Sequence, residues 1–140
     1  MPFCFKISVV IITLASFLSV NTDAQMLYFE NRKAGELRSD GKLYLSGRWV
    51  GEFRDNGRVY IRGRRVGQIR SNNTFYSDGR KVGDVRRGGS IYKSGRRVGQ
   101  IRSNGSIYEG GRVIGRVRGS FSEAEIVAIY FFYFQDLLEK

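Results

Sequence analysis

The sequence contains no histidine and only one cysteine, Cys4, among its 140 residues. Without histidine the chain can form neither a Ser-His catalytic pair nor a histidine-ligated metal site. Cys4 lies near the start of the chain, so the remainder offers no thiol nucleophile and no disulfide. We therefore predict that the protein is not an enzyme and has no catalytic residue, no metal ion and no cofactor.

Acidic residues are also scarce, with 13 Asp and Glu against 24 Lys and Arg, which gives a formal net charge of +11. A strongly basic protein is expected to meet polyanions or anionic lipid head groups. The N-terminal segment suggests that the protein is exported, and nucleic acid is a less expected partner outside the cytoplasm.

Residues 1–24 have the layout of a secretory signal peptide. Lys6 precedes an apolar run over residues 7–20, and Ala24, with the small residue Thr22 two positions earlier, offers a cleavage site. A run of about 14 residues is short for crossing a bilayer, so an uncleaved membrane anchor is the less favoured alternative. We expect cleavage near Ala24 and a secreted or periplasmic protein.

Residues 25–120 repeat a 16-residue phrase six times. In each unit a tyrosine is followed seven positions later by a glycine and nine positions later by a branched or aromatic apolar residue. A fixed short period predicts that each copy is one supersecondary unit. The tyrosines are Tyr28, Tyr44, Tyr60, Tyr76, Tyr92 and Tyr108, and the glycines are Gly35, Gly51, Gly67, Gly83, Gly99 and Gly115.

Each unit carries two turn signals, separated by short runs rich in Val, Ile, Tyr and Phe. Pairs such as Asn56-Gly57 predict two-residue type I′ turns, and pairs such as Gly63-Arg64 predict type II′ turns. Two strands per unit give 12 antiparallel strands, and closing them into a barrel would remove the exposed sheet edges. The predicted fold class is therefore all-β, a closed 12-stranded antiparallel barrel of six hairpin repeats.

The turn positions decide which side chains share a face of the sheet. With these turns, Tyr60 lies opposite Gly67, and Ile69 lies opposite Tyr76. This uncharged face is expected to point inward, with each tyrosine ring over the glycine opposite it. The outward face would carry Val59, Val66, Gln68, Arg70, Phe75 and Val82.

Residues 121–140 are expected to form an apolar helix. Ser122 and Glu125 have the spacing of a capping box, and nine consecutive residues, 126–134, are apolar or aromatic. A helix that is apolar all round belongs in a core or a membrane, and nine residues rise only about 14 Å. We favour a plug in the barrel lumen. The alternatives are a lid across one mouth and a helix that inserts into a membrane or docks onto a partner.

Over residues 27–118 the chain follows the short hairpin pattern G-x-I-x-x-x-G-x-I-Y-x-x-G. This pattern resembles the β-flower families, which are shallow symmetric barrels of petal-like hairpins. A 12-stranded barrel around an apolar C-terminal helix is also similar in architecture to the tubby C-terminal and phospholipid-scramblase-like barrels. Tubby-like domains bind phosphoinositide head groups through basic surface residues, so this resemblance implies binding of anionic lipid. It assigns no binding residue in this chain.

Two series of arginines are the candidate anion-binding residues. The guanidinium group suits bidentate capture of phosphate or carboxylate, and symmetry would spread each series into a ring. The alternative is a solvated outer face that the repeat merely copies. The first series, expected on the outer face near the Asn-Gly rim, is Arg38, Arg54, Arg70, Arg86, Arg102 and Arg118. The second, expected in turns at the opposite rim with Arg65, Lys81 and Arg97 beside it, is Arg48, Arg64, Arg80, Arg96 and Arg112.

The single tryptophan, Trp49, is a candidate contact residue because tryptophan is enriched in binding hot spots. The carboxylates do not indicate catalysis, because they share one outward column whose charge changes from unit to unit and no pair stands out. That column is Glu36, Glu52, Gln68, Asp84, Gln100 and Arg116.

These observations favour an exported, non-enzymatic binding or structural protein, monomeric, whose basic rims hold anionic lipid head groups or an envelope polysaccharide. Peripheral contact with a membrane is compatible with this hypothesis. The alternatives are an envelope hydrolase or transferase that uses rim carboxylates, and a repeat scaffold that recognises another protein.

Overall fold

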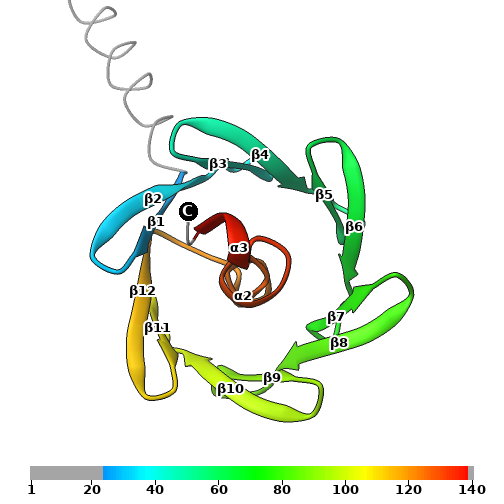
Figure 1. The fold of residues 1–140 in the computed structure, drawn as a ribbon, viewed down its shortest axis with the longest axis vertical. Helices are drawn as coiled ribbons and strands as arrows, with labels where there is room; N and C mark the ends of the chain where they lie inside the picture. The colour runs from blue at the N-terminus through cyan, green and yellow to red at the C-terminus, as the bar shows by residue number, and fades with distance from the viewer. Residues whose placement is uncertain (1–23, 139–140) are drawn as a thin grey trace, which may run out of the picture.

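Residues 24–138, which the computed structural model describes, form a closed antiparallel β-barrel with a helical segment in its lumen (Figure 1). Twelve strands follow one another round the barrel in chain order, and β1 (Gln25–Phe29) pairs with β12 (Arg112–Arg118) to close it. This confirms the predicted fold class. The predicted signal peptide lies outside the described residues except for Ala24. The other strands are β2 (Arg32–Leu37), β3 (Lys42–Leu45), β4 (Arg48–Phe53), β5 (Arg58–Ile61), β6 (Arg64–Ile69), β7 (Thr74–Ser77), β8 (Arg80–Val85), β9 (Ser90–Lys93), β10 (Arg96–Ile101) and β11 (Ser106–Glu109).

A two-residue turn at the tip of each hairpin joins an odd-numbered strand to the next even-numbered strand. In the turn between β5 and β6, Arg62 and Gly63 have φ values of 50° and 80°, which is type I′ geometry. The predicted type II′ turn at Gly63-Arg64 is therefore wrong by one residue, and Arg64 already belongs to β6. Both positions of a type I′ turn need a positive φ, and glycine adopts it at the second position, Gly63, without steric cost.

The loops that join one hairpin to the next contain four residues between the strand ends rather than the predicted two. After β4, the backbone N–H of Arg54 donates to the carbonyl of Arg58 at 2.9 Å and encloses residues 55–57. Gly57 alone in this loop has a positive φ, 83°, as in a type I turn followed by a left-handed residue. The predicted two-residue turn at Asn56-Gly57 is wrong.

These one-residue shifts reverse the faces of the odd-numbered strands, because a slip of one residue moves every side chain of a strand to the opposite face. Val59 pairs with Gly67 and is fully buried, and Phe75 is also fully buried, although both were expected to point outward. Tyr60 and Tyr76 lie on the outer wall, although they were expected to fill the lumen.

The even-numbered strands keep their predicted faces from the glycine onward. Gly67 faces the lumen and Ile69 packs against the core, as predicted. Val66 is the extra residue of a β-bulge, because the ladder passes from Arg65 to Gly67 between two consecutive partners. The bulge brings Val66 against the core, so the predicted outward position of this residue, and of its equivalent Val82, is wrong.

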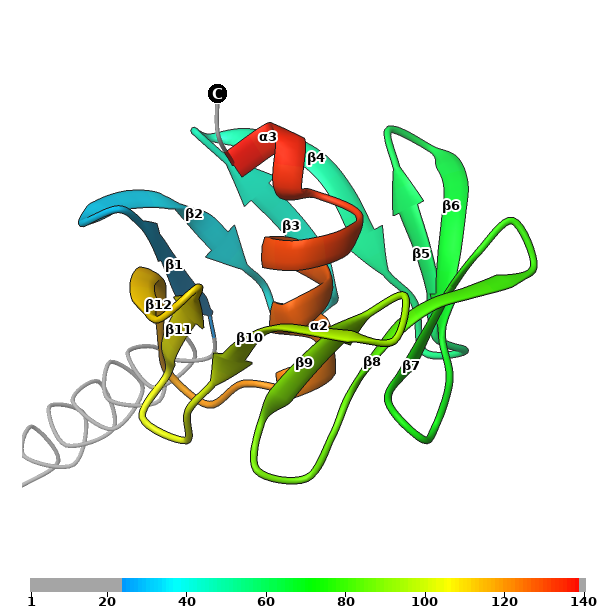
Figure 2. The same cartoon turned by 60° about the horizontal axis from the view of Figure 1, so that its bottom comes forward.

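The C-terminal segment lies inside the barrel, which confirms the predicted plug (Figure 2). It consists of α2 (Glu123–Val127), a π-helix η2 (Ala128–Phe132) and α3 (Gln135–Leu138). Side chains from Ile126 to Phe131 are at most 1% exposed, so the apolar run forms the centre of the core. None of the helices among the described residues is long and apolar enough to cross a membrane.

Five consecutive aromatic rings of this segment occupy the space over five of the repeated glycines, one ring for each of five hairpins. A Cβ atom on Gly99 would lie 2.8 Å from Cζ of Phe131, and one on Gly51 would lie 2.6 Å from Cε1 of Phe134. The glycines thus make room for helix rings and not, as predicted, for the tyrosines of the wall. The pairs are Tyr130 with Gly115, Phe131 with Gly99, Phe132 with Gly83, Tyr133 with Gly67, and Phe134 with Gly51.

The π-helix suits this arrangement because successive rings must reach successive hairpins. An α-helix turns about 100° per residue, whereas neighbouring hairpins of a six-hairpin barrel are about one sixth of a circle apart. A π-helix places more residues in each turn and therefore rotates less between neighbouring residues. The backbone N–H of Tyr133 donates to the carbonyl of Ala128 at 2.9 Å, which is the i to i+5 bond of this geometry.

Two of the five rings are tyrosines, and their hydroxyl groups reach backbone carbonyls where two hairpins meet. The Tyr133 hydroxyl lies 2.7 Å from the carbonyl oxygen of Tyr76 and 3.3 Å from that of Gln68. The Tyr130 hydroxyl donates to the carbonyl of Tyr28. Burial raises the pKa of Tyr133 to about 12 and that of Tyr130 further, so both hydroxyl groups stay protonated as donors.

The start of α2 differs in one detail from the prediction. Ser122 is the N-cap residue with extended backbone angles, φ −91° and ψ 122°, but its side chain makes no capping hydrogen bond. The predicted capping box is therefore not formed. Glu125 lies partly buried beside the barrel wall, and burial raises the pKa of its carboxyl group above the ordinary value.

Candidate anion-binding surface

The first arginine series lies on the outer wall, and each of its members stacks over a tyrosine ring. Arg54 has its guanidinium carbon 3.8 Å from the centroid of the Tyr60 ring. Both side chains are on the outer face because Tyr60 pairs with Glu52, two residues before Arg54 on the neighbouring strand. The full set of pairs is Arg38 with Tyr44, Arg54 with Tyr60, Arg70 with Tyr76, Arg86 with Tyr92, Arg102 with Tyr108, and Arg118 with Tyr28.

Stacking orients these guanidinium groups without using their hydrogen-bond donors. A planar guanidinium that rests its face on an aromatic ring keeps its N–H groups in the plane, at its edges. Those edges are the part that forms paired hydrogen bonds with an oxoanion. The tyrosine column therefore holds the arginines in place, a role that sequence reasoning missed. The signal was present, since each arginine precedes a tyrosine by six residues in the first five units.

Three arginines of the first series already have an anionic partner in the structure. Arg38 pairs with Glu36 at 3.1 Å, Arg54 with Glu52 at 3.3 Å, and Arg86 with Asp84 at 3.3 Å. The equivalent position holds Gln68, Gln100 or Arg116 in the remaining units. Among the described residues, Arg70, Arg102 and Arg118 make no ion pair, and all three are exposed.

The second arginine series lies at the hairpin tips, apart from the first. Each member is the first residue of an even-numbered strand, directly after the type I′ turn, and each is exposed. The first series lies at the other end of the same strands. The structure therefore places the two series at opposite ends of each hairpin and does not bring them into one site. The exposed tip residues are Arg48, Arg64, Arg80, Arg96 and Arg112.

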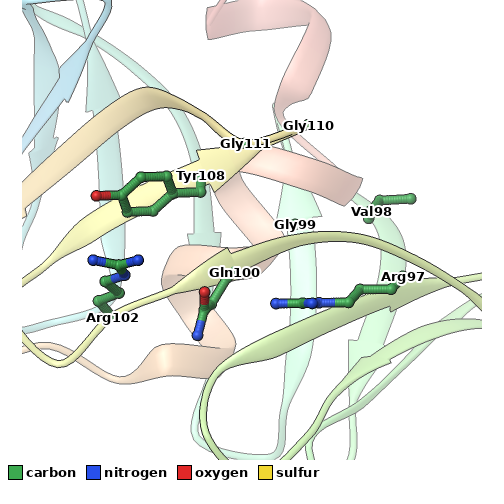
Figure 3. Close-up of a pocket in the computed structure, with 8 residues that line it drawn as sticks. All are labelled: Arg97, Val98, Gly99, Gln100, Arg102, Tyr108, Gly110 and Gly111. Carbon is green, nitrogen blue, oxygen red and sulfur yellow. The ribbon is translucent and has the colours of Figure 1, made fainter.

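Hollows open on the outer wall where one hairpin meets the next. Between β10 and β11, a hollow of about 360 Å³ is lined by Arg97, Gln100, Arg102 and Tyr108 (Figure 3). A second hollow, of about 290 Å³ between β6 and β7, has the equivalent residues of an earlier unit. In both hollows the residue equivalent to Glu36 is a glutamine, Gln100 in the first and Gln68 in the second.

Trp49 is exposed on the outer wall, where it pairs with Tyr44 across the β3–β4 hairpin. Its side chain is 54% exposed, and its indole N–H donates to the carbonyl of Gly51 at 3.0 Å. The hydrogen bond fixes the ring against the strand, and the Lys42 ammonium lies over the ring, 5.1 Å from its centroid. Its role as a contact residue stays a prediction.

The outer-wall carboxylates face arginines rather than one another, as the three ion pairs show. General acid–base catalysis by two carboxylates needs both of them at one reacting centre. Within residues 24–138, no cluster of three or more Asp, Glu, His or Cys side chains could hold a metal ion.

No family model, no curated protein and no solved structure matches the chain.

Proposed function

We propose that this chain is an exported, non-enzymatic binding protein that holds an acidic polysaccharide against the arginines of its outer wall. The observation that carries this proposal is the ring of six exposed arginines, each with its guanidinium carbon over a tyrosine ring of the outer wall. We also propose, from the petal-like hairpin repeat, that the chain belongs with the β-flower families.

A polysaccharide with a repeating charged unit can contact several of the arginines that recur around the outer wall. A polyanion that contacts several arginines gains avidity, because each contact after the first is intramolecular. The ring is continuous because β12 pairs with β1, so a flexible chain can follow the wall from one hairpin to the next.

An anionic membrane is the less favoured ligand, for a reason of packing. Stable peripheral binding usually combines basic residues with an apolar group that enters the bilayer. The apolar run of the C-terminal segment is buried in the lumen. The large hydrophobic residues that are exposed within residues 24–138 are Trp49 and Val113, on different hairpins.

Retention on immobilised heparin, a sulfated polysaccharide, tests the proposal. Replacing Arg38, Arg54, Arg70, Arg86 and Arg102 with glutamine should lower the salt concentration needed for elution. The matched control replaces the five tip arginines, which removes the same charge from the hairpin tips. Equal losses in the two variants would show that net charge alone matters, and no retention of the unmodified protein at low salt would refute the proposal. Co-sedimentation with phosphatidylglycerol vesicles in preference to heparin binding would favour the membrane instead.

A further inference from the structure

The hollow between β10 and β11 differs from its counterparts in net charge, because the equivalent hollows at β6–β7 and β12–β1 are each lined by two arginines and one carboxylate, Asp78 or Glu30. Arg97 and Gln100 line it from β10, Arg102 lines it from the position directly after that strand, and Tyr108 faces them from β11 (Figure 3). No carboxylate is among its lining residues. The backbone of Gly110 and Gly111 completes the wall, so no side chain covers the hollow from the hairpin tip.

The donors of both arginines are available in this hollow. The guanidinium carbon of Arg102 lies 4.4 Å from the centroid of the Tyr108 ring. Neither Arg97 nor Arg102 forms an ion pair with another residue in the part of the chain that the structure describes. Gln100 occupies the position where other units place an acid. Its amide is uncharged and therefore neutralises neither arginine, and its nitrogen donates to the carbonyl of Gly88 at 3.3 Å.

The hollow between β6 and β7 has nearly the same composition and serves as an internal comparison. It contains Arg65, Gln68, Arg70 and Tyr76, but Asp78 lines it where the β10–β11 hollow has Gly110. Arg65 is also engaged there, since its guanidinium donates to Oε1 of Gln68 at 3.4 Å. One carboxylate, Asp78, and one hydrogen bond of Arg65 therefore distinguish the two hollows.

We propose that the β10–β11 hollow is a discrete site for a single oxoanion group, a sulfate, phosphate or carboxylate, bound between Arg97 and Arg102. This inference rests on the proposed function and identifies which part of the wall recognises the charged group of the polysaccharide. The β6–β7 hollow binds the same group more weakly, because Asp78 repels it and offsets one of the two arginines.

Exchanging Gly110 of the β10–β11 hollow and Asp78 of the β6–β7 hollow for each other tests the site. Gly110 has a φ of 60° and Asp78 a φ of 54°, so each turn accepts the other residue without a change of backbone. Gly110→Asp should weaken binding of a fluorescein-labelled heparin hexasaccharide about fivefold, and Asp78→Gly should strengthen it, measured by anisotropy at fixed salt. Arg97→Gln and Arg102→Gln should each weaken it about tenfold, as for the loss of one charged hydrogen bond. Arg65→Gln and Arg70→Gln, which alter the weaker hollow, should each weaken it by a smaller factor than the equivalent changes at Arg97 and Arg102.

A second measurement separates a local site from general attraction. In NMR titration with inorganic phosphate, the side-chain Nε–Hε signals of Arg97 and Arg102 should shift more than those of Arg38 and Arg54. Equal shifts at all arginines, or equal losses of hexasaccharide affinity for the two hollows, would overturn the site while leaving the proposed function intact. Absence of any polyanion binding would overturn both. Binding to phosphatidylglycerol vesicles that depends on Arg97 and Arg102 would keep the site and overturn the polysaccharide as its source.

Discussion

The rings of the C-terminal segment should contribute more to the stability of the barrel than the tyrosines of its wall, and Phe131 offers a direct test. Its side chain is 1% exposed and fills the space over Gly99. Phe131→Ala removes the ring and leaves a cavity in the lumen, which should cost about 3–5 kcal/mol of unfolding free energy. Domains are typically stable by about 5–15 kcal/mol, so the variant should still fold but with little margin.

Tyr108 lies on the outer side of the same wall and serves as the comparison. Tyr108→Ala removes a half-buried ring and its stacking with Arg102, a cation–π contact worth about 0.5–1 kcal/mol at a partly exposed site. The loss of a favourable strand residue adds up to about 1 kcal/mol. We therefore expect a total loss of about 0.5–2 kcal/mol, well below the loss for Phe131→Ala.

Urea unfolding followed by far-UV circular dichroism measures both losses, provided that the denaturant slope is unchanged between variants. Phe131→Leu is the control, because it keeps an apolar side chain in the lumen and should recover part of the loss. A loss for Tyr108→Ala as large as that for Phe131→Ala would refute the reasoning. It would mean that the tyrosines fill the lumen and that the glycines face them.

Three further outcomes follow from particular contacts. Tyr133→Phe should lower the unfolding free energy by about 1 kcal/mol, because it removes the hydroxyl donor at the Tyr76 carbonyl; urea unfolding checks this, and an unchanged midpoint would contradict it. Glu125→Gln should raise stability at pH 7 but leave it unchanged at pH 3.5. The folded-state pKa of Glu125 is raised, so the wild-type protein loses stability as the pH rises from about 4 through that pKa, and unfolding curves of both proteins at the two pH values test the sign. The exposed indole of Trp49 should be quenched by acrylamide in the folded protein nearly as efficiently as in urea, and strong protection would contradict its position on the outer wall.

The barrel could be predicted from the sequence because its turns recur at a fixed spacing and its short strands are rich in β-branched and aromatic residues. The faces could not be predicted from hydrophobicity alone, since Val59, Tyr60 and Ile61 follow one another and place apolar atoms on both sides. The register set by the turns then decided which face of each strand was predicted to point into the lumen. Arg62 adopts a positive φ, which is uncommon for a residue with a long side chain, and this displaced the predicted turn by one position.

The candidate site was predicted in part for the same reason. The repeat spacing placed Arg70 and its equivalents on the outer face, where they lie, because the even-numbered strands keep their register beyond the glycine. Their stacking on the tyrosines was missed once the tyrosines had been assigned to the lumen. The match of one helix ring to one hairpin was beyond sequence reasoning, because it depends on how deep the helix sits and on its local change to π geometry.

The pairing of rings with hairpins constrains how this repeat can change in number. In an open solenoid a duplicated unit simply lengthens the stack, because each unit contacts only its neighbours. Here a seventh hairpin would widen the cylinder and add a second glycine, besides Gly35, with no helix ring above it, whereas a five-hairpin version would have too little room for the helix. Recombination between neighbouring copies at the gene level should therefore yield unstable proteins unless the C-terminal segment changes at the same time.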